Sequence, residues 1–214
     1  MKTKMSAVSL PGRMASSGGH KAGAGIVLLA TFLWLLSMPF ISGGHAVAAA
    51  KKYTRSVEDY ALPDVVLVNQ NGQKVRLKSL LSSDRPVVVD FIYGTCTTIC
   101  PVLSAGYANL QKTLGADSTK VHLVSISIDP ENDTPKVMKE YLKRYRARPG
   151  WDFLTGTRGD VDRVMKSFNA YVYNKMSHTL LTLIRLPKGG KWIRISGPMS
   201  TAELMEECAG AGMK

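Results

Sequence analysis

Apolar runs alternate along the chain with segments in which apolar residues recur every three or four positions. The near-continuous runs Val87–Tyr93 and Val121–Ile128 are typical of central strands that are buried on both faces. Between them, helical spacing predicts a helix that ends at Gly115, with one apolar stripe formed by Leu103, Tyr107, Leu110 and Leu114. The order strand, helix, strand is that of an α/β domain.

Three further helices are predicted in the second half of the chain. Thr134 and Pro135 suit the N-cap and the first position of a helix whose inner side carries Val137, Met138, Tyr141, Leu142 and Tyr145. We expect Asp160 to cap the next helix, whose stripe is Val161, Val164, Met165, Phe168 and Tyr171. Ser200 and Glu203 form a capping box for the last helix.

Two hairpins complete the pattern. Val65–Val68 and Val75–Leu77 flank the turn signal Asn71-Gly72, and Leu180–Leu186 and Lys191–Ile195 flank Gly189-Gly190. The resulting order βαβα…ββα predicts an α/β fold. It is a thioredoxin-like sandwich with an extra N-terminal β-hairpin and helices on both faces of the sheet.

The first 50 residues have the pattern of a targeting segment. Basic residues precede a 16-residue uncharged apolar stretch, Ile26–Ile41, and small residues follow it. This order is that of a secretory signal peptide, with cleavage after Ala48 or Ala50; an uncleaved N-terminal membrane anchor is the alternative. We therefore expect an exported chain, periplasmic or on the outer face of the cytoplasmic membrane, with residues 51–61 as a tether and 62–214 as one domain.

Composition and charge limit the function. Hydrophobic residues make up 45% of the 214 residues and charged residues 21%, which excludes a disordered chain and a polytopic membrane protein. The net charge is +12, of which the leader carries four basic residues and no acid. We predict no nucleic-acid binding, because export removes the chain from DNA. The basic run Lys136–Arg148 is expected to be a solvated face, or one that meets an acidic partner or anionic lipid.

The chemistry is concentrated where the first core strand meets its helix, in Cys96–Pro101. Pro101 suits the first helical turn, so Cys100 lies at or near the N-cap and Cys96 on the loop before it. Both sulfurs then face the positive end of the helix dipole, which favours thiolates. Three residues separate the cysteines, and this spacing is compatible with a disulfide or with two thiolates on one metal ion.

The sequence resembles the SCO/SenC family in three places: Cys96–Pro101, the segment Ser127–Pro135 at the end of the next strand, and His178 later in the chain. The resemblance runs from about residue 62 to 207. Members are thioredoxin-like, copper-binding assembly factors of cytochrome c oxidase. They deliver copper to oxidase subunit II, or reduce the cysteines of its copper site. The resemblance implies that Cys96, Cys100 and His178 are the copper ligands.

The ligand types agree with that implication. Two thiolates and an imidazole form a soft-to-borderline set that selects copper, as Cu(I) or Cu(II). His178 lies in a loop that enters a strand, whereas His122 lies inside a core-strand pattern. The chain departs from many members in having Thr97 and Thr98 between the cysteines and in lacking an acidic residue just before His178.

Other candidates receive structural roles. Asp129 and Asp133 follow a core strand at the edge that carries the cysteine loop; capping the helix at Pro135 is favoured over a role beside the metal. Cys208 is expected to line the core, since it falls four residues after Leu204 on the last helix. Met176 is favoured as a packing residue over an auxiliary ligand.

The sequence thus leaves two classes of function. The first is an exported copper metallochaperone whose partner is a copper-accepting protein such as oxidase subunit II, with the inner membrane as a further contact. The second is a thiol-disulfide oxidoreductase in which Cys96 attacks and Cys100 resolves. A peroxidase ranks third, because no activating arginine can be identified beside the cysteines.

Overall fold

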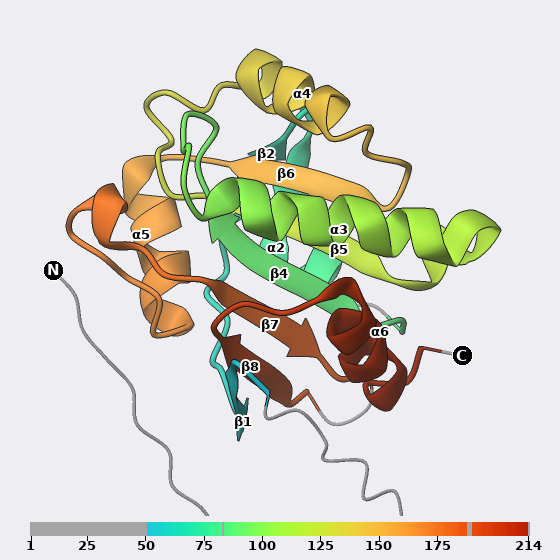
Figure 1. The fold of residues 1–214 in the computed structure, drawn as a ribbon. Coiled ribbons are helices and arrows are strands. Elements are labelled where there is room, and N and C mark those ends of the chain that lie inside the picture. The colour runs from blue at the N-terminus through green and yellow to red at the C-terminus, as the bar shows by residue number, and fades with distance from the viewer. Residues whose placement is uncertain (1–50, 83, 188–189, 214) are drawn as a thin grey trace, which may run out of the picture. The chain divides into compact units, whose positions relative to one another are not determined.

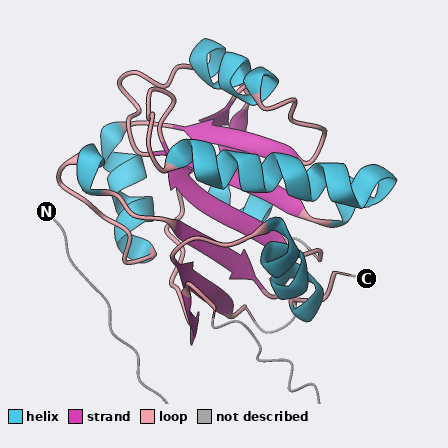
Figure 2. Cartoon of the chain, viewed as in Figure 1, coloured by secondary structure: helices cyan, strands magenta, loops and turns pink. Residues whose placement is uncertain are grey.

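The computed structural model describes residues 51–82, 84–187 and 190–213. These residues form one mixed β-sheet with helices packed on it (Figures 1 and 2). Within these residues its strand order is β1-β8-β7-β4-β5-β6-β2-β3. The strands are β1 Thr54–Glu58, β2 Val66–Asn69, β3 Lys74–Arg76, β4 Val87–Ile92, β5 His122–Ser127, β6 Trp151–Thr155, β7 Leu181–Arg185 and β8 Trp192–Ser196. The helices are α2 Leu77–Leu81, α3 Cys100–Leu114, α4 Pro135–Arg144, α5 Arg158–Ser167 and α6 Thr201–Gly210.

The two near-continuous apolar runs form the centre of the sheet, as predicted. Every residue of β4 and of β5 is buried, and the two strands pair in parallel with Val87 opposite His122 and Ile92 opposite Ser127. β7 lies on the other side of β4 and runs antiparallel to it. The carboxyl end of β4 therefore lies beside the amino end of β7, where the segment from residue 175 onward enters the sheet.

Helices cover both faces, as expected for a thioredoxin-like sandwich. Adjacent strand residues point to opposite faces. On one face, Phe91 of β4 makes an edge contact with Phe168, which directly follows α5, with ring centroids 5.9 Å apart. On the other face, the buried Asp90 lies near Tyr107 of α3, which also packs against α6. No helix among the described residues is long and apolar enough to cross a membrane.

The helix starts are mostly those predicted. Thr134 caps α4 by accepting from the backbone N–H of Val137, and Ser200 and Glu203 form the expected capping box of α6. The prediction for α5 is wrong in one respect: Thr157 is the N-cap and Asp160 lies in the first turn. Asp160, three residues after the Thr157 cap, interacts favourably with the positive end of the helix dipole. Aspartate is also common as an N-cap, so the sequence alone does not separate the two roles.

Two apolar residues lie outside the core against expectation. Val137, predicted on the inner side of α4, is 37% exposed, and Tyr171, predicted on the stripe of α5, is 41% exposed. The second difference has a simple cause, since α5 ends at Ser167 and Tyr171 follows in a loop.

Three elements were not predicted. β1 lies within residues 51–61, which were expected to be a tether, and it pairs antiparallel with β8 from Thr54 to Glu58. Its residues are largely exposed, so they carry no apolar signal; Tyr53 and Arg55 instead bond to Glu207 of α6. β6 and the short α2 were also missed, the latter because Leu77 was assigned to a strand. The leader, residues 1–50, lies outside the described residues.

Candidate metal centre

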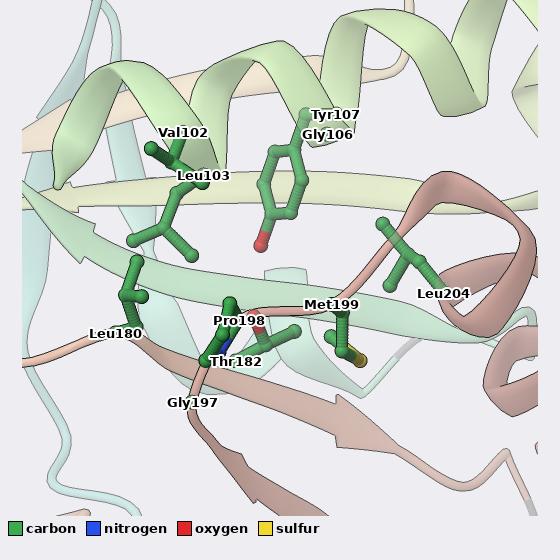
Figure 3. A pocket seen from close by; sticks show the side chains of 10 residues that line it. All are labelled: Val102, Leu103, Gly106, Tyr107, Leu180, Thr182, Gly197, Pro198, Met199 and Leu204. Carbon is green, nitrogen blue, oxygen red and sulfur yellow. The ribbon is translucent and has the colours of Figure 1, made fainter. Parts of the chain in front are cut away.

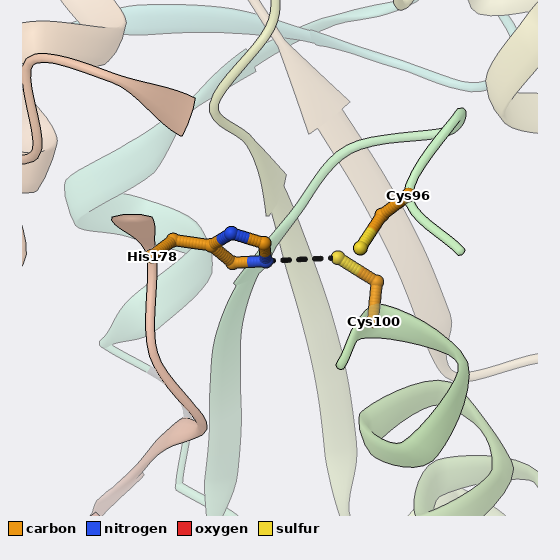
Figure 4. Close-up of side chains that lie close together, drawn as sticks. All are labelled: Cys96, Cys100 and His178. Carbon is orange, nitrogen blue, oxygen red and sulfur yellow. Dashed lines mark hydrogen bonds between the residues drawn. The ribbon is translucent and has the colours of Figure 1, made fainter. Parts of the chain in front are cut away.

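Three ligand atoms from separate segments converge at the carboxyl end of β4 (Figure 4). Cys96 lies on the loop after β4, Cys100 is the first residue of α3, and His178 lies on the loop before β7. The two sulfurs and one ring nitrogen of His178 all lie within 4.8 Å of one another. Among the described residues this is the one group of three or more such side chains that could hold a metal ion.

Sheet topology brings His178 to the cysteines. Asp90 of β4 lies opposite Thr182 of β7, so the chain before β7 passes the loop that leaves β4. Ile99 is the N-cap of α3 and makes no side-chain cap, which leaves the first backbone N–H groups of the helix directed at the cysteine loop. The placement of Cys100 at the helix start is therefore as predicted, with Pro101 in the first turn.

His178 presents one nitrogen to the cysteines and uses the other to fix its ring. Its Nδ1 is 2.6 Å from the carbonyl oxygen of Lys175, which can only accept, so Nδ1 carries the proton. Nε2 is consequently an acceptor, and it lies 3.1 Å from Sγ of Cys100. Burial lowers the pKa of His178 below its usual value and keeps the imidazole neutral, the form that binds a metal.

The two thiols ionise differently. Burial alone raises the pKa of Cys96, but hydrogen bonds from the backbone N–H groups of Cys100 and Thr98 and from the Thr98 hydroxyl outweigh it and lower the pKa to about 7. Burial raises the pKa of Cys100 far above its usual range, and the neighbouring Cys96 adds to this effect. The lowered pKa of Cys96 agrees with the thiolate expected there, whereas the raised pKa of Cys100 favours its thiol and differs from the expectation.

Asp133 supports the loop that carries Cys96. Its Oδ1 accepts the backbone N–H of Gly94 at 3.0 Å, and its Oδ2 accepts the hydroxyl of Ser127 at the end of β5. A side chain at Gly94 would place its Cβ 2.8 Å from Asp133 Oδ1. The expectation that Asp133 or Asp129 caps α4 is wrong, because Thr134 does so and leaves Asp133 free to hold the cysteine loop.

Asp129 bonds to the loop that carries His178. Its Oδ2 accepts from Nζ of Lys175 at 2.6 Å. Met176 is 66% exposed and its sulfur accepts from the hydroxyl of Tyr93 at 3.1 Å, so the packing role expected for Met176 is wrong. The Tyr93 ring stands edge-on to His178, with centroids 5.2 Å apart. Sequence reasoning missed Tyr93 and Lys175, since neither belongs to a recognisable local motif.

The remaining titratable candidates lie elsewhere. Cys208 is fully buried in α6, as predicted, and burial raises its pKa to about 12. His122 is buried on β5 and bonds to Asp152 at 2.8 Å. Asp90, also missed, is fully buried on β4 and makes no hydrogen bond of ordinary geometry within the described residues; burial raises its pKa to about 7. That carboxyl adds to the rise in the pKa of Cys100.

A small apolar pocket of about 20 Å³, room for one water molecule, lies beside the site between α3 and the start of β7 (Figure 3). The hydroxyl of Tyr107 points into it and makes no hydrogen bond within the described residues. Its walls include Val102 and Leu103, which follow Cys100, and Leu180, which follows His178. The pocket therefore offers packing surface beside the cysteines, with Met199 as the one sulfur-bearing side chain in its lining.

The donor set fits a soft monovalent ion. Two sulfurs and a neutral imidazole nitrogen suit Cu(I), and they lack the oxygen donors that hard cations require. Both cysteines are buried and His178 is partly buried, so a bound ion would be largely shielded from water. The same pair of cysteines, which are free in this structure, can also exchange with a disulfide.

Sequence comparison finds bacterial relatives of this chain. The SCO1 protein homolog of Bacillus subtilis is 38% identical over 117 residues, which are 53% of this chain and 60% of that protein. The protein SenC of Rhodobacter capsulatus is 30% identical over 124 residues, 58% of this chain and 54% of that protein. The matched segments thus span little more than half of these relatives.

Solved structures share the fold. BsSco, a member of the Sco family of cytochrome c oxidase assembly proteins with a disulfide switch, is 30% identical with a TM-score of 0.61, covering 74% of this chain and 96% of that one. Bradyrhizobium japonicum ScoI with copper bound is 30% identical with a TM-score of 0.55, covering 70% and 96%. The SCO1/SenC family profile matches residues 56–209, nearly all of the described part, and the chain belongs to this family.

Proposed function

We propose that this protein is an exported copper metallochaperone that binds copper through Cys96, Cys100 and His178. The observation that carries the proposal is the convergence of two sulfurs and an imidazole nitrogen within 4.8 Å, from three segments. A site whose ligands already lie together needs little rearrangement to accept the ion. The copper is cargo, received and passed on.

The state of each ligand supports copper binding. His178 is neutral and its Nε2 faces the cysteines. Cys96, with a pKa of about 7, is half ionised at neutral pH, and the first sulfur is therefore ready to bind. Cys100 would lose its proton as the ion arrives, because a bound cation stabilises the thiolate. The copper-bound structure of ScoI, 30% identical to this chain, supports copper as the bound metal.

Family membership supports a proposal for the acceptor. We propose delivery to the copper site of a cytochrome c oxidase, with oxidase subunit II as the copper-accepting partner. Ligand exchange between donor and acceptor thiolates accomplishes the transfer without any change in oxidation state. The leader would place the protein in the periplasm or on the outer face of the cytoplasmic membrane, where such a partner exposes its copper site.

Copper titration of the reduced protein tests the proposal. We expect one Cu(I) per chain, and at least ~10-fold weaker binding after His178→Ala, Cys96→Ala or Cys100→Ala, measured by competition with a Cu(I) chelator. Cys208→Ala is the matched control, since Cys208 is buried in α6 outside the ligand group, and it should bind as wild type. The proposal fails if reduced protein binds no copper, or if His178→Ala binds as tightly as wild type.

A second function is favoured by the unequal thiols. A low-pKa Cys96 beside a buried Cys100 of raised pKa suits a thiol-disulfide oxidoreductase. The Cys96 thiolate would attack a partner disulfide and release one partner thiolate; Cys100 would then displace the second, leaving a Cys96–Cys100 disulfide and a reduced partner. The disulfide switch of BsSco supports this alternative. Disulfide-reducing activity that survives His178→Ala would identify it.

A further inference from the structure

Lys175 makes two different contacts at the base of the loop that carries His178. Its backbone oxygen accepts the Nδ1 proton of His178 at 2.6 Å, and its ammonium donates to Oδ2 of Asp129 at 2.6 Å. Lys175 opens the 3₁₀ turn Lys175–Ser177, which Asn174 caps by accepting the backbone N–H of Met176. One residue thus joins the imidazole to the end of a neighbouring strand.

Asp129 is a firm anchor for that ammonium. Its side chain is only 6% exposed, and both of its oxygens accept from the side-chain amide of Asn132 at 3.0 Å. Its own backbone N–H donates to the hydroxyl of Ser127, the last residue of β5. The carboxylate therefore cannot move far from the sheet, and the Lys175 ammonium is held with it.

Tyr93 holds the same loop from the other side. The Lys175 ammonium lies 5.1 Å from the centre of the Tyr93 ring, and the hydroxyl of that ring donates to the sulfur of Met176. Tyr93 is 3% exposed and directly follows β4, so it is as fixed as the sheet. Two consecutive loop residues, Lys175 and Met176, are in this way tied to the ends of β5 and β4.

We propose that Lys175 is a positioning residue for the metal ligand His178. Its bond to Asp129 fixes the loop, and its carbonyl then fixes both the tautomer and the direction of the ring, so that Nε2 faces the cysteines before metal arrives. The inference rests on the proposed copper site. A histidine ligand whose second nitrogen has a fixed partner binds metal more tightly, and loss of such a partner typically costs about 10- to 100-fold in affinity.

The plain alternative is an ordinary ion pair. Exposed ion pairs contribute little to the stability of a protein, because solvent screens the two charges and both side chains lose conformational freedom. Here one partner is buried, and the bond links a loop to a strand 46 positions away. An ordinary ion pair predicts, at most, a small change in unfolding temperature. A positioning role predicts a change at His178 itself.

The test is Lys175→Met, measured by competition for Cu(I) in two backgrounds. In the wild-type background we expect affinity to fall about 10-fold. In the His178→Ala background the same substitution should change affinity less than twofold, because there is no ring left to position. Lys143→Met, on the solvent face of α4, is the matched control and should leave affinity unchanged in both.

Metal-free protein gives an independent measure. Nitrogen-15 spectra of the imidazole should show one Nδ1-protonated tautomer in wild type and a mixture of tautomers in Lys175→Met and in Asp129→Asn. Equal copper loss in both backgrounds, or an unchanged His178 tautomer, would overturn the positioning role. If instead His178→Ala alone binds copper like wild type, the ligand assignment itself fails, which is a different outcome from failure of the Lys175 inference.

Discussion

The chemistry of single residues at the site depends on which proton each one holds. Cys96 receives hydrogen bonds from Thr98 and Cys100 that favour its thiolate, whereas Cys100, the first residue of α3, is too deeply buried to ionise unaided. His178 donates its ring N–H, at Nδ1, in a hydrogen bond to the backbone oxygen of Lys175, and Nε2 is left as an acceptor. The three ligands therefore differ in protonation. Cys96 ionises near neutral pH, the Cys100 thiol donates to the imidazole, and His178 is neutral.

This difference in protonation predicts a pH dependence of thiol reactivity. Because the pKa of Cys96 is lowered from an ordinary value of 9 to about 7, its alkylation rate should rise with pH through a midpoint near 7 and level off well above that pH. Cys100 and Cys208, whose pKa values are raised, should remain unlabelled over the same range. Mass spectrometry after pulses of iodoacetamide from pH 5 to 10 measures both. Equal labelling of Cys96 and Cys100, or a Cys96 midpoint near 9, would contradict the assignment.

At the scale of elements, the loop between β4 and α3 is held by its fit to Asp133. Asp133 is 1% exposed and is bonded to both Gly94 and Ser127, so it cannot turn away from a larger residue at position 94. A Cβ added at Gly94 would lie 2.8 Å from Asp133 Oδ1 and 3.1 Å from Cγ1 of Val137 in α4, so there is no space for a side chain. Three elements thus determine where Cys96 lies.

Gly94→Ala should consequently destabilise the protein by about 1–3 kcal/mol, as overpacking usually does. Urea unfolding of the metal-free protein measures the change. Gly106→Ala is the matched control, because a Cβ there meets nothing within 4 Å and α3 gains from alanine in a helix. We expect that control to keep or raise stability. A Gly94→Ala protein as stable as wild type would show that the loop is not held by Asp133.

Much of this arrangement could be predicted from the sequence, and the limits have physical causes. β4, β5, α3, α4 and α6 follow from apolar periodicity and caps, which are local signals. β1 is not predicted because an exposed edge strand has no apolar alternation. The sequence does not distinguish Asp160 from Thr157 as the cap of α5, because both are residue types found at helix starts and only the backbone geometry separates them. Side-chain bonds between loops, such as Lys175 with Asp129, leave no periodic trace at all.

At the scale of the whole molecule, the site exists because the sheet places β7 beside β4. The cysteines are four positions apart and their association is visible in the sequence, but His178 lies 78 positions from Cys100. Only the strand order unites them, and the sequence alone named His178 through a family resemblance. The basic residues of α4 are exposed, as expected of a solvated face. An acidic partner for that face stays a prediction.

X-ray absorption of the Cu(I)-loaded protein at the copper edge tests the central claim most directly. Wild type should show a first shell of two sulfurs and one imidazole nitrogen, with the outer scattering typical of a histidine ring. His178→Ala should lose the ring signal and keep both sulfurs, while Cys208→Ala should match wild type. Copper held by sulfur alone in the wild-type protein, with no imidazole in the shell, would contradict the account.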